Sequence, residues 1–288
     1  MDIIKKLAEE LQIRPGQAQA AVKLIDEGNT IPFISRYRKE ATGALNDEVL
    51  RNLYERLNYL RNLEEKKEQV LSSIEEQGKL TEELKKQILA ADTLVAVDDL
   101  YRPYRPKRRT RATIAKEKGL EPLANIIMLQ MTDKPIEEEA QDFVSEDKGV
   151  ESVADAINGA KDIIAEHISD EADYRIYLRK LTMDRGSVAS TAKKPEESSV
   201  YEMYYEFEEP IKKLAGHRVL ALNRGEKEKI LTVKVNAPEE EAMGWLQKQV
   251  ITKENPITKP ILREVVEDSY KRLIAPAIER EIRSDLTE

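Results

Sequence analysis

The 288-residue sequence contains no cysteine, and aromatic residues make up only 5% of it. The lack of cysteine excludes disulfide bonds and thiol catalysis and is consistent with a reducing cytosol. No apolar run approaches the roughly 20 residues that a membrane-spanning helix needs. The amphipathic start also lacks the apolar block of a signal peptide. Glycine and proline are sparse, at 11 and 12 residues. This composition is typical of a soluble helical protein with no membrane partner.

Charge is abundant but close to balanced between the two signs. Charged residues make up 35% of the chain, and the net charge is -8. Because a dedicated nucleic-acid-binding domain is usually basic overall, we do not expect tight binding by the chain as a whole. Local basic stretches matter more than the sum.

Helical periodicity dominates the first 185 residues. Two short helices are predicted over residues 2–12 and 15–28, as a pair that resembles a helix-turn-helix. Acids in the second of them argue against reading of base sequence. A helix of about 30 residues, roughly 45 Å long, then runs from Asn46 to Gly78. Further helices are predicted from Thr81 onward and over 119–131, 135–146, 150–168 and 170–185.

The pattern changes after Gly186. The stretch SVASTA is strand-like, and the alternating ILTVKV at 230–235 predicts a second strand of a small antiparallel sheet. Helix returns over 238–251 and again over 261–286, where Pro276 predicts a kink. We therefore expect a mainly α fold, an elongated multi-helix assembly with a small α+β insert and a long C-terminal helix. The expected units are a helical domain over 1–190, an α+β unit over 191–257 and the start of a central helix over 258–288.

The strongest local feature is the basic segment YRPYRPKRRTR, residues 101–111, which holds six basic residues and no acid. Its prolines exclude regular helix. Arginine and lysine neutralise phosphates, while tyrosine and arginine planes stack on unpaired bases. The alternative is that the arginines pair with acids such as Asp98 and Asp99 and brace the helices. The candidate nucleic-acid-binding residues of this segment are Arg102, Tyr104, Arg105, Lys107, Arg108, Arg109 and Arg111.

A second basic stretch lies in RYRKEATG, where Arg36, Arg38 and Lys39 are candidate nucleic-acid-binding residues. Glu40 dilutes its charge. The alternative is a buried turn whose polar groups tie helices together.

The sequence predicts no catalytic residue, metal site or cofactor. His167 and His217 are the only histidines, and neither has the spacing of a metal ligand. His167 lies on an apolar helix stripe, which predicts a structural role. The sequence has no glycine-rich phosphate loop or nucleophile elbow. Its carboxylates lie on charge-rich helix faces, from which no metal-binding pair can be picked out.

Two long stretches carry a resemblance to a known family, IPFISRYRKEATGALNDEVLRNLYERL and DDLYRPYRPKRRTRATIAKEKGLEPLA. They are similar to the Tex family of bacterial transcription accessory proteins, and the likeness covers essentially the whole chain. The resemblance implies a cytoplasmic, elongated, largely helical protein. It also implies an architecture similar to that of the eukaryotic elongation factor that binds histones.

In that family the helical region precedes an RNase-H-like domain, helix-hairpin-helix elements and a C-terminal OB-fold domain, which is taken to dominate nucleic-acid binding. None of these is present here, so we expect an amino-terminal fragment. The last apolar stripe is then expected to fray or to pack on a second copy.

The predicted function is that of a non-enzymatic scaffold in a transcription-associated protein that binds RNA or DNA non-specifically, mainly through the missing C-terminal domains. The alternative is a protein-interaction module that docks on the transcription machinery, with the basic segment purely structural.

Overall fold

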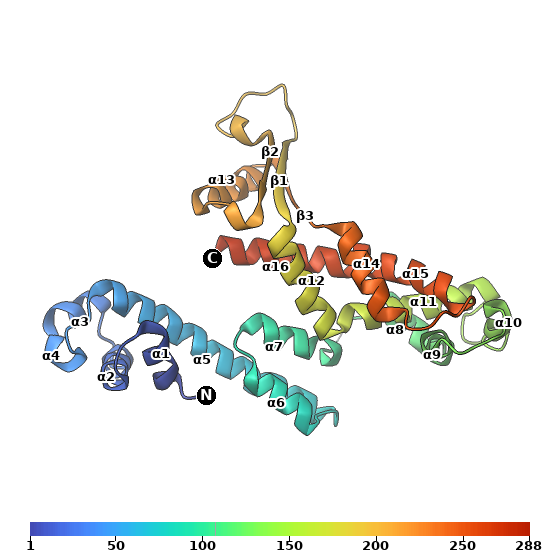
Figure 1. Ribbon diagram of the computed structural model, residues 1–288, viewed down its shortest axis with the longest axis horizontal. Coiled ribbons are helices and arrows are strands. Elements are labelled where there is room, and N and C mark those ends of the chain that lie inside the picture. The colour runs from blue at the N-terminus through green and yellow to red at the C-terminus, as the bar shows by residue number, and fades with distance from the viewer. Residues whose placement is uncertain (107) are drawn as a thin grey trace. The chain divides into compact units, whose positions relative to one another are not determined.

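The computed structural model describes residues 1–106 and 108–288, and these form two compact units, Met1–Arg105 and Pro106–Glu288 (Figure 1). Each unit has its own hydrophobic core. The fold is mainly helical, with one three-stranded antiparallel sheet and a long helix at the C-terminal end, which confirms the predicted fold class. The predicted boundaries at 190 and 257 remain a prediction. In the described part of the chain, no helix is long and apolar enough to cross a bilayer.

The first unit is built on one long helix, α5 (Asp47–Glu76). The side chain of Asn46 accepts a hydrogen bond from the Val49 N–H at 2.9 Å and caps the helix, as the sequence predicted. The apolar stripe of α5, which includes Leu50 and Leu57, is buried against the shorter helices of the unit. These helices are α1 (Ile3–Leu11), α2 (Pro15–Asp26), α3 (Ile31–Tyr37), α6 (Glu82–Ala90) and α7 (Leu94–Tyr101), while the short α4 (Lys39–Thr42) packs on α2 and α3.

The second unit is organised around α11 (Val153–Asp170), which packs against helices from before and after it in the chain. Small residues such as Ala156 and Ala160 are fully buried along it and allow close approach. Its helical neighbours are α8 (Arg111–Glu117), α9 (Glu121–Leu129), α10 (Ile136–Gln141), α12 (Ala172–Arg185) and α15 (Thr258–Asp268). The helix α14 (Glu239–Val250) packs in turn on α12 and α15.

The sheet has the strand order β2-β1-β3, with β1 (Ser187–Ala192) in the centre, β2 (Glu206–Pro210) on one side and β3 (Leu231–Asn236) on the other. Both pairings are antiparallel, and Val188 lies opposite Glu209 and Val235. The strands β1 and β3 confirm the prediction. The strand β2 was not predicted, because three of its five residues are glutamates, and α13 (Gly216–Lys227) was not predicted either.

The C-terminal stretch runs without interruption from α15 through a π-helical segment, η4 (Ser269–Ile274), into α16 (Ala275–Thr287). The distortion expected at Pro276 takes the form of this wide turn directly before it. The expectation that the last apolar stripe lacks a cover is wrong for Ile278 and Ile282. Both are buried, because α12, α13 and β3 pack against α16.

Candidate nucleic-acid interface

The basic segment crosses the division between the units, which lies between Arg105 and Pro106. In the first unit, α7 ends at Tyr101 and a 3-10 turn, η1 (Arg102–Tyr104), follows. The Gln77 side chain donates a hydrogen bond to the Tyr104 carbonyl at 2.8 Å, and the Tyr101 hydroxyl lies 2.9 Å from Ser73 Oγ. Arg102 and Tyr104 are half-buried, so this part of the segment is fixed to the end of α5.

The Arg105 guanidinium lies 3.4 Å from the Asp98 carboxylate and over the Tyr101 ring. Lys66 approaches the same carboxylate at 3.4 Å. The Arg105 and Asp98 side chains remain 44% and 43% exposed, however. Surface ion pairs of this kind contribute about 0–1 kcal/mol. Arg105 therefore makes the contact that the bracing alternative expects, but the pair is open to water.

In the second unit, Arg108, Arg109 and Arg111 are exposed. Arg109 lies 3.1 Å from Glu117, a pair in which both side chains are largely exposed. Arg108 and Arg111 form no ion pair with any residue that the structure describes. Lys107 lies outside the described residues.

Thr110 caps α8 at the end of the segment and donates a hydrogen bond to the Glu166 carboxylate at 2.7 Å. Burial raises the pKa of Asp162, and the charges of Arg272 and Arg111 oppose that rise. The charge of Arg111 thus acts on the Asp162 carboxylate, although the two side chains, both in the described part of the chain, form no ion pair.

The second basic stretch surrounds the break between α3 and α4. Arg38 donates a hydrogen bond to the Tyr37 carbonyl at 2.9 Å, and its guanidinium lies 5.0 Å from the centre of the Phe33 ring. Arg36 and Lys39 are exposed. Only Thr42 fits the expected buried turn: it is fully buried, and its hydroxyl binds the Arg38 carbonyl. The stretch combines a buried anchor with outward cations.

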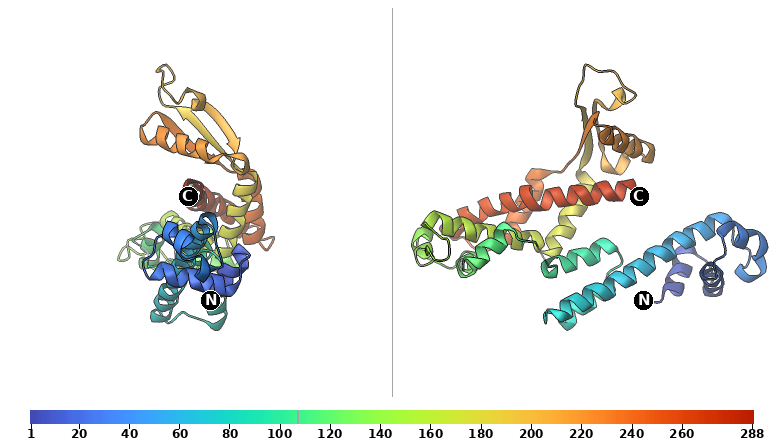
Figure 2. Two further views of the ribbon diagram at one scale, coloured as in Figure 1. Left: turned by 90° about the vertical axis from the view of Figure 1, so that its left-hand side faces the viewer. Right: turned by 180° about the vertical axis from the view of Figure 1, so that it is seen from behind.

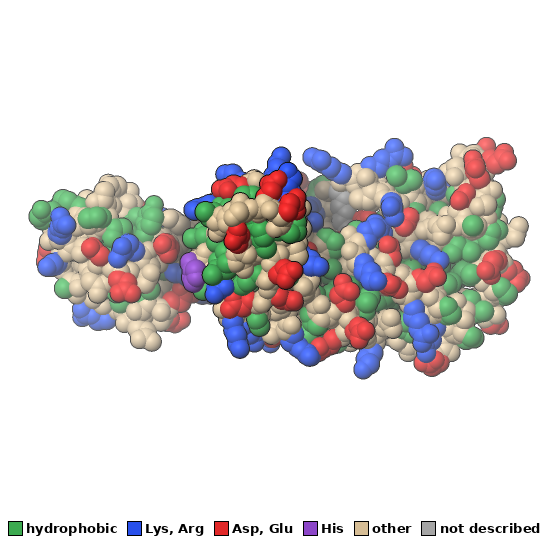
Figure 3. Space-filling model, turned by 90° about the horizontal axis from the view of Figure 1, so that it is seen from above, with side chains coloured by type: hydrophobic (Ala, Val, Ile, Leu, Met, Phe, Trp, Pro, Cys, Tyr) green, Lys and Arg blue, Asp and Glu red, His purple; other side chains and the backbone are tan. Residues whose placement is uncertain are grey.

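The two basic stretches do not meet within the first unit. The α3–α4 break lies beside the start of α5, whereas Tyr104 is bonded to Gln77 at its end. Figures 1 and 2 both show α3 and α7 toward opposite ends of α5. A helix of 30 residues is about 45 Å long. Elsewhere the charges mix: on the face shown in Figure 3, basic and acidic side chains are interspersed.

His167 was predicted to have a structural role because it lies on an apolar helix stripe. Its side chain is exposed, so the expected burial is wrong. His167 lies at a small pocket of about 200 Å³ rather than in the core. Among the described residues, no three His, Cys, Asp or Glu side chains gather where a metal ion could bind.

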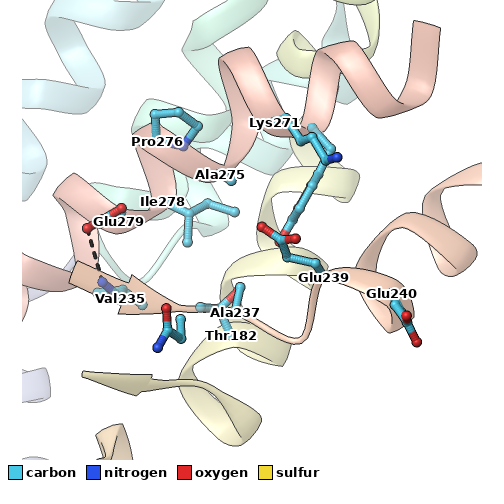
Figure 4. Close-up of a pocket in the computed structure, with 12 residues that line it drawn as sticks. Thr182, Val235, Ala237, Glu239, Glu240, Lys271, Ala275, Pro276, Ile278 and Glu279 are labelled. Carbon is cyan, nitrogen blue, oxygen red and sulfur yellow. Dashed lines mark hydrogen bonds between the residues drawn. The ribbon is translucent and has the colours of Figure 1, made fainter. Parts of the chain in front are cut away.

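A larger pocket of about 540 Å³ lies between the end of β3, α14 and α16 and is lined by Glu239, Glu240 and Glu279 (Figure 4). Glu279 accepts a hydrogen bond from the Val235 N–H at 3.0 Å, which covers the outer edge of β3. Burial, with a smaller contribution from Glu239, raises the pKa of Tyr270 in this pocket to about 12. Glu279 thus serves the fold, and a buried neutral phenol beside carboxylates does not form a phosphate site.

The structure also brings together three aromatic side chains that the sequence analysis did not single out. The rings of Tyr177 and Trp245 stack at 3.9 Å with an angle of 10°, and Tyr174 meets Trp245 edge-on at 5.8 Å. Tyr174 and Tyr177 are three residues apart on α12, a spacing that places them on one helix face. That spacing, together with the single tryptophan of the chain, is the sequence signal that could have drawn attention to them.

Two family models match the chain. The Tex-like protein N-terminal domain matches residues 1–75, and the Tex central region-like model matches residues 131–288, more than half of the sequence. The chain belongs to the Tex family. The basic segment lies between the two matched Tex regions, while Arg36, Arg38 and Lys39 lie within the first.

Individual Tex relatives extend over most of the chain. The Bacillus subtilis protein YdcI is 47% identical over 99% of this chain and 40% of its own length. The transcriptional accessory protein Tex of Neisseria gonorrhoeae is 42% identical over 81% of this chain and 31% of its own length. The human S1 RNA-binding domain-containing protein 1 is 32% identical over 99% of this chain and 30% of its own length. The chain thus spans less than half the length of these relatives.

Proposed function

We propose that the chain is a non-enzymatic, cytoplasmic helical scaffold of a transcription-associated protein, and that it adds weak, non-specific phosphate contacts to those of other domains. The names of two relatives support this, because one refers to transcription and the other to RNA binding. We assign the main nucleic-acid-binding activity to regions outside this chain, because the chain covers only 31% and 30% of the length of these two relatives.

The observation that carries the proposal is the unequal state of the basic segment. Arg105 and Arg109 face carboxylates, whereas Arg108 and Arg111 are exposed and form no ion pair among the described residues. An exposed guanidinium binds a phosphate at little desolvation cost, because both groups remain at the surface. It also breaks no ion pair with a carboxylate when the charge-assisted hydrogen bond to the phosphate forms. We therefore assign the phosphate contacts first to Arg108 and Arg111.

Salt dependence tests this assignment. If about four basic groups of the segment reach phosphates, they should contribute about -3 to the log–log slope of single-strand affinity against salt, at about -0.7 per phosphate. The expected affinity is in the non-specific range, roughly 10⁻⁴–10⁻⁶ M. Single-stranded RNA and DNA would be titrated into the 288-residue chain at several salt concentrations, with fluorescence anisotropy as the readout.

A matched pair of double variants sharpens the test. Arg108→Gln with Arg111→Gln should flatten the slope by about 1.4, two phosphates' worth, and leave the melting temperature unchanged. Arg105→Gln with Arg109→Gln removes the same charge from groups that already face carboxylates and should flatten the slope less. Equal slopes for the first variant and the unmodified chain would refute the assignment.

We propose separately that the chain catalyses no reaction. Incubation with labelled RNA, DNA or nucleotides and Mg²⁺ or Mn²⁺ should give no turnover. A cleavage activity that co-purifies with the chain and disappears when one carboxylate is replaced would show that the chain is an enzyme.

The second candidate function is a protein-docking module, and the loop between β1 and β2 favours it. The loop is held by the Tyr205 hydroxyl, which donates to the Glu197 carbonyl at 2.6 Å, and by the buried rings of Tyr201 and Tyr204. Val200 and Met203 nevertheless point outward, 88% and 66% exposed. Exposed apolar side chains on an ordered loop suit contact with another protein. Binding of a transcription protein that resists high salt and is lost in Val200→Ser with Met203→Ser would favour this reading.

A further inference from the structure

The aromatic cluster of Tyr174, Tyr177 and Trp245 lies at the surface of the second unit. The Tyr177 ring covers one side of Trp245 and is itself 40% exposed. Phe, Tyr and Trp are few in this chain, and most of an aromatic ring's stabilising effect comes from burial. An exposed stack is therefore poorly explained by packing alone.

Two lysines lie beside the stack and can meet the phosphates of a strand. Lys180 and Lys248 each lie three residues beyond a ring of the stack, on α12 and α14 respectively, so each lies on the same helix face as that ring. Both are exposed. Two nearby carboxylates are already occupied, since Glu241 pairs with Arg185 and Asp184 with Lys212.

Two acids, Asp173 and Glu171, lie beside Tyr174, where burial and the charges of these carboxylates raise the pKa of the tyrosine hydroxyl. The two lysines and these two acids balance, in contrast to the net charge of -8 of the whole chain.

A pocket adjoins the cluster. Tyr174, which touches Trp245 edge-on, also lines the pocket of about 200 Å³ that His167 borders. Its apolar walls come from residues such as Ile164, Ile168 and Leu262, while Gln249 adds an amide and Glu171 a carboxylate. A slot with apolar walls and with an imidazole, an amide and a carboxylate at its border suits a flat heterocycle whose edge carries hydrogen-bonding groups.

We propose that the Tyr177–Trp245 stack and the pocket beside Tyr174 form a binding site for unpaired bases of single-stranded nucleic acid. One base stacks on the exposed Tyr177 ring, and a neighbouring base enters the pocket at His167. The site is sequence-tolerant, because every base has an aromatic face. It differs from the basic segment, to which we assign phosphate contacts, so it adds recognition of single strands over duplexes.

The single tryptophan provides a direct readout. Emission from Trp245 is the only tryptophan signal of the chain, so a change reports on this site. The chain would be titrated with single-stranded oligo(U), single-stranded oligo(dT) and a duplex of equal length. We expect saturable quenching by the single strands and none by the duplex. A difference between the two single strands identifies RNA or DNA as the preferred source of the base.

Substitutions test the geometry. Tyr177→Ala should weaken single-strand binding at least about fivefold, the lower end of the loss for one stacking ring, whereas Tyr177→Phe should keep it. Lys180→Gln with Lys248→Gln alters exposed side chains only. It should flatten the salt slope by about 1.4 while the fold stays intact. This second variant keeps the test decisive if Tyr177→Ala fails to fold.

The outcomes separate this site from the basic segment. In Arg108→Gln with Arg111→Gln, Trp245 quenching should persist at reduced affinity. If anisotropy shows binding while Trp245 emission stays constant, the bases lie elsewhere and the inference is wrong, although the proposed phosphate contacts stand. If Tyr177→Ala lowers the melting temperature and leaves binding unchanged, the stack is structural and the inference is again wrong. A saturable quench only by apolar peptides would assign the site to a protein.

Discussion

Arginines face carboxylates both at the α12–α16 interface and in the basic segment, but water reaches the two regions to different degrees. At the interface, Arg175 lies 3.2 Å and Arg179 2.8 Å from Glu281, and the Arg175 side chain is fully buried. In the basic segment, Arg105 and Arg109 pair with Asp98 and Glu117 while remaining 44% and 68% exposed. Breaking a buried pair leaves a charge without compensation, whereas breaking a surface pair leaves it in water.

The comparison shows that the same residue type serves the fold in one place and remains available in the other. Arg175 cannot leave Glu281 for a phosphate without disturbing the packing of α12 on α16. Arg109 can exchange Glu117 for a phosphate at little cost, because both partners are already hydrated. Exposure, rather than the presence of a nearby acid, therefore distinguishes bracing from binding.

The largest effect is expected at the buried pair. Glu281→Gln should destabilise the chain by roughly 3 kcal/mol, the lower end of the range for a broken buried pair, because Glu281 itself is partly exposed. Urea denaturation would measure the loss. The matched control is Glu226→Gln, which breaks the more exposed pair with Arg283 on the same helix. Similar losses for the two variants would contradict the distinction between buried and exposed pairs.

Much of this fold could be predicted from the sequence, because periodicity carries most of it. The stripe of α5 and the cap at Asn46 are local signals, and both were found. The strand β2 was missed because its glutamates give it no apolar face, and it is held by pairing with β1, a non-local contact.

The candidate site could be predicted only as a group of residue types. The sequence shows that Arg105 and Arg108 are both arginines near acids. It cannot show which one faces Asp98, because that depends on the 3-10 turn after α7. The exposure of His167 was missed for a similar reason, since neighbours on the same helix, such as Ile164 and Ile168, are buried.

The second basic stretch offers the next effect in size. Arg36→Gln with Lys39→Gln removes two exposed cations at the other end of α5 and should flatten the salt slope for single strands by up to about 1.4. Its effect should add to that of Arg108→Gln with Arg111→Gln, because each phosphate contact contributes its own share of the slope. Anisotropy titrations of the two double variants and their combination would measure this. A stretch that only holds helices together would leave the slope unchanged.

Two bidentate surface ion pairs of the first unit, Glu10–Arg56 and Asp26–Arg61, are expected to make the stability of the fold depend on pH. Hydrogen bonds from Arg56 lower the pKa of Glu10 below its ordinary 4.5, and those from Arg61 lower the pKa of Asp26 below 3.8. Because these carboxyls hold protons less tightly when folded, they stabilise the fold fully above their ordinary pKa. That contribution is lost as the pH falls through the lowered values.

Scanning calorimetry from about pH 7 down to about pH 3 should show this decline, and Arg56→Gln with Arg61→Gln should reduce it. An equally steep decline in the double variant would assign the acid sensitivity to other carboxyls.

The smallest effect is expected at Arg105. Arg105→Gln should lower the free energy of unfolding by less than about 1 kcal/mol, because Asp98 keeps both its water and Lys66 as a second cation. The effect should shrink further in high salt, which screens exposed charges. A double-mutant cycle of Arg105→Gln and Asp98→Asn, measured by urea denaturation at low and high salt, would give the coupling energy directly. A coupling of several kcal/mol that persists in high salt would mean that Arg105 braces the end of α7 as firmly as Arg175 holds α16. In that case exposure would not separate the two kinds of arginine, and Arg105 would have to be withdrawn from the phosphate-binding candidates.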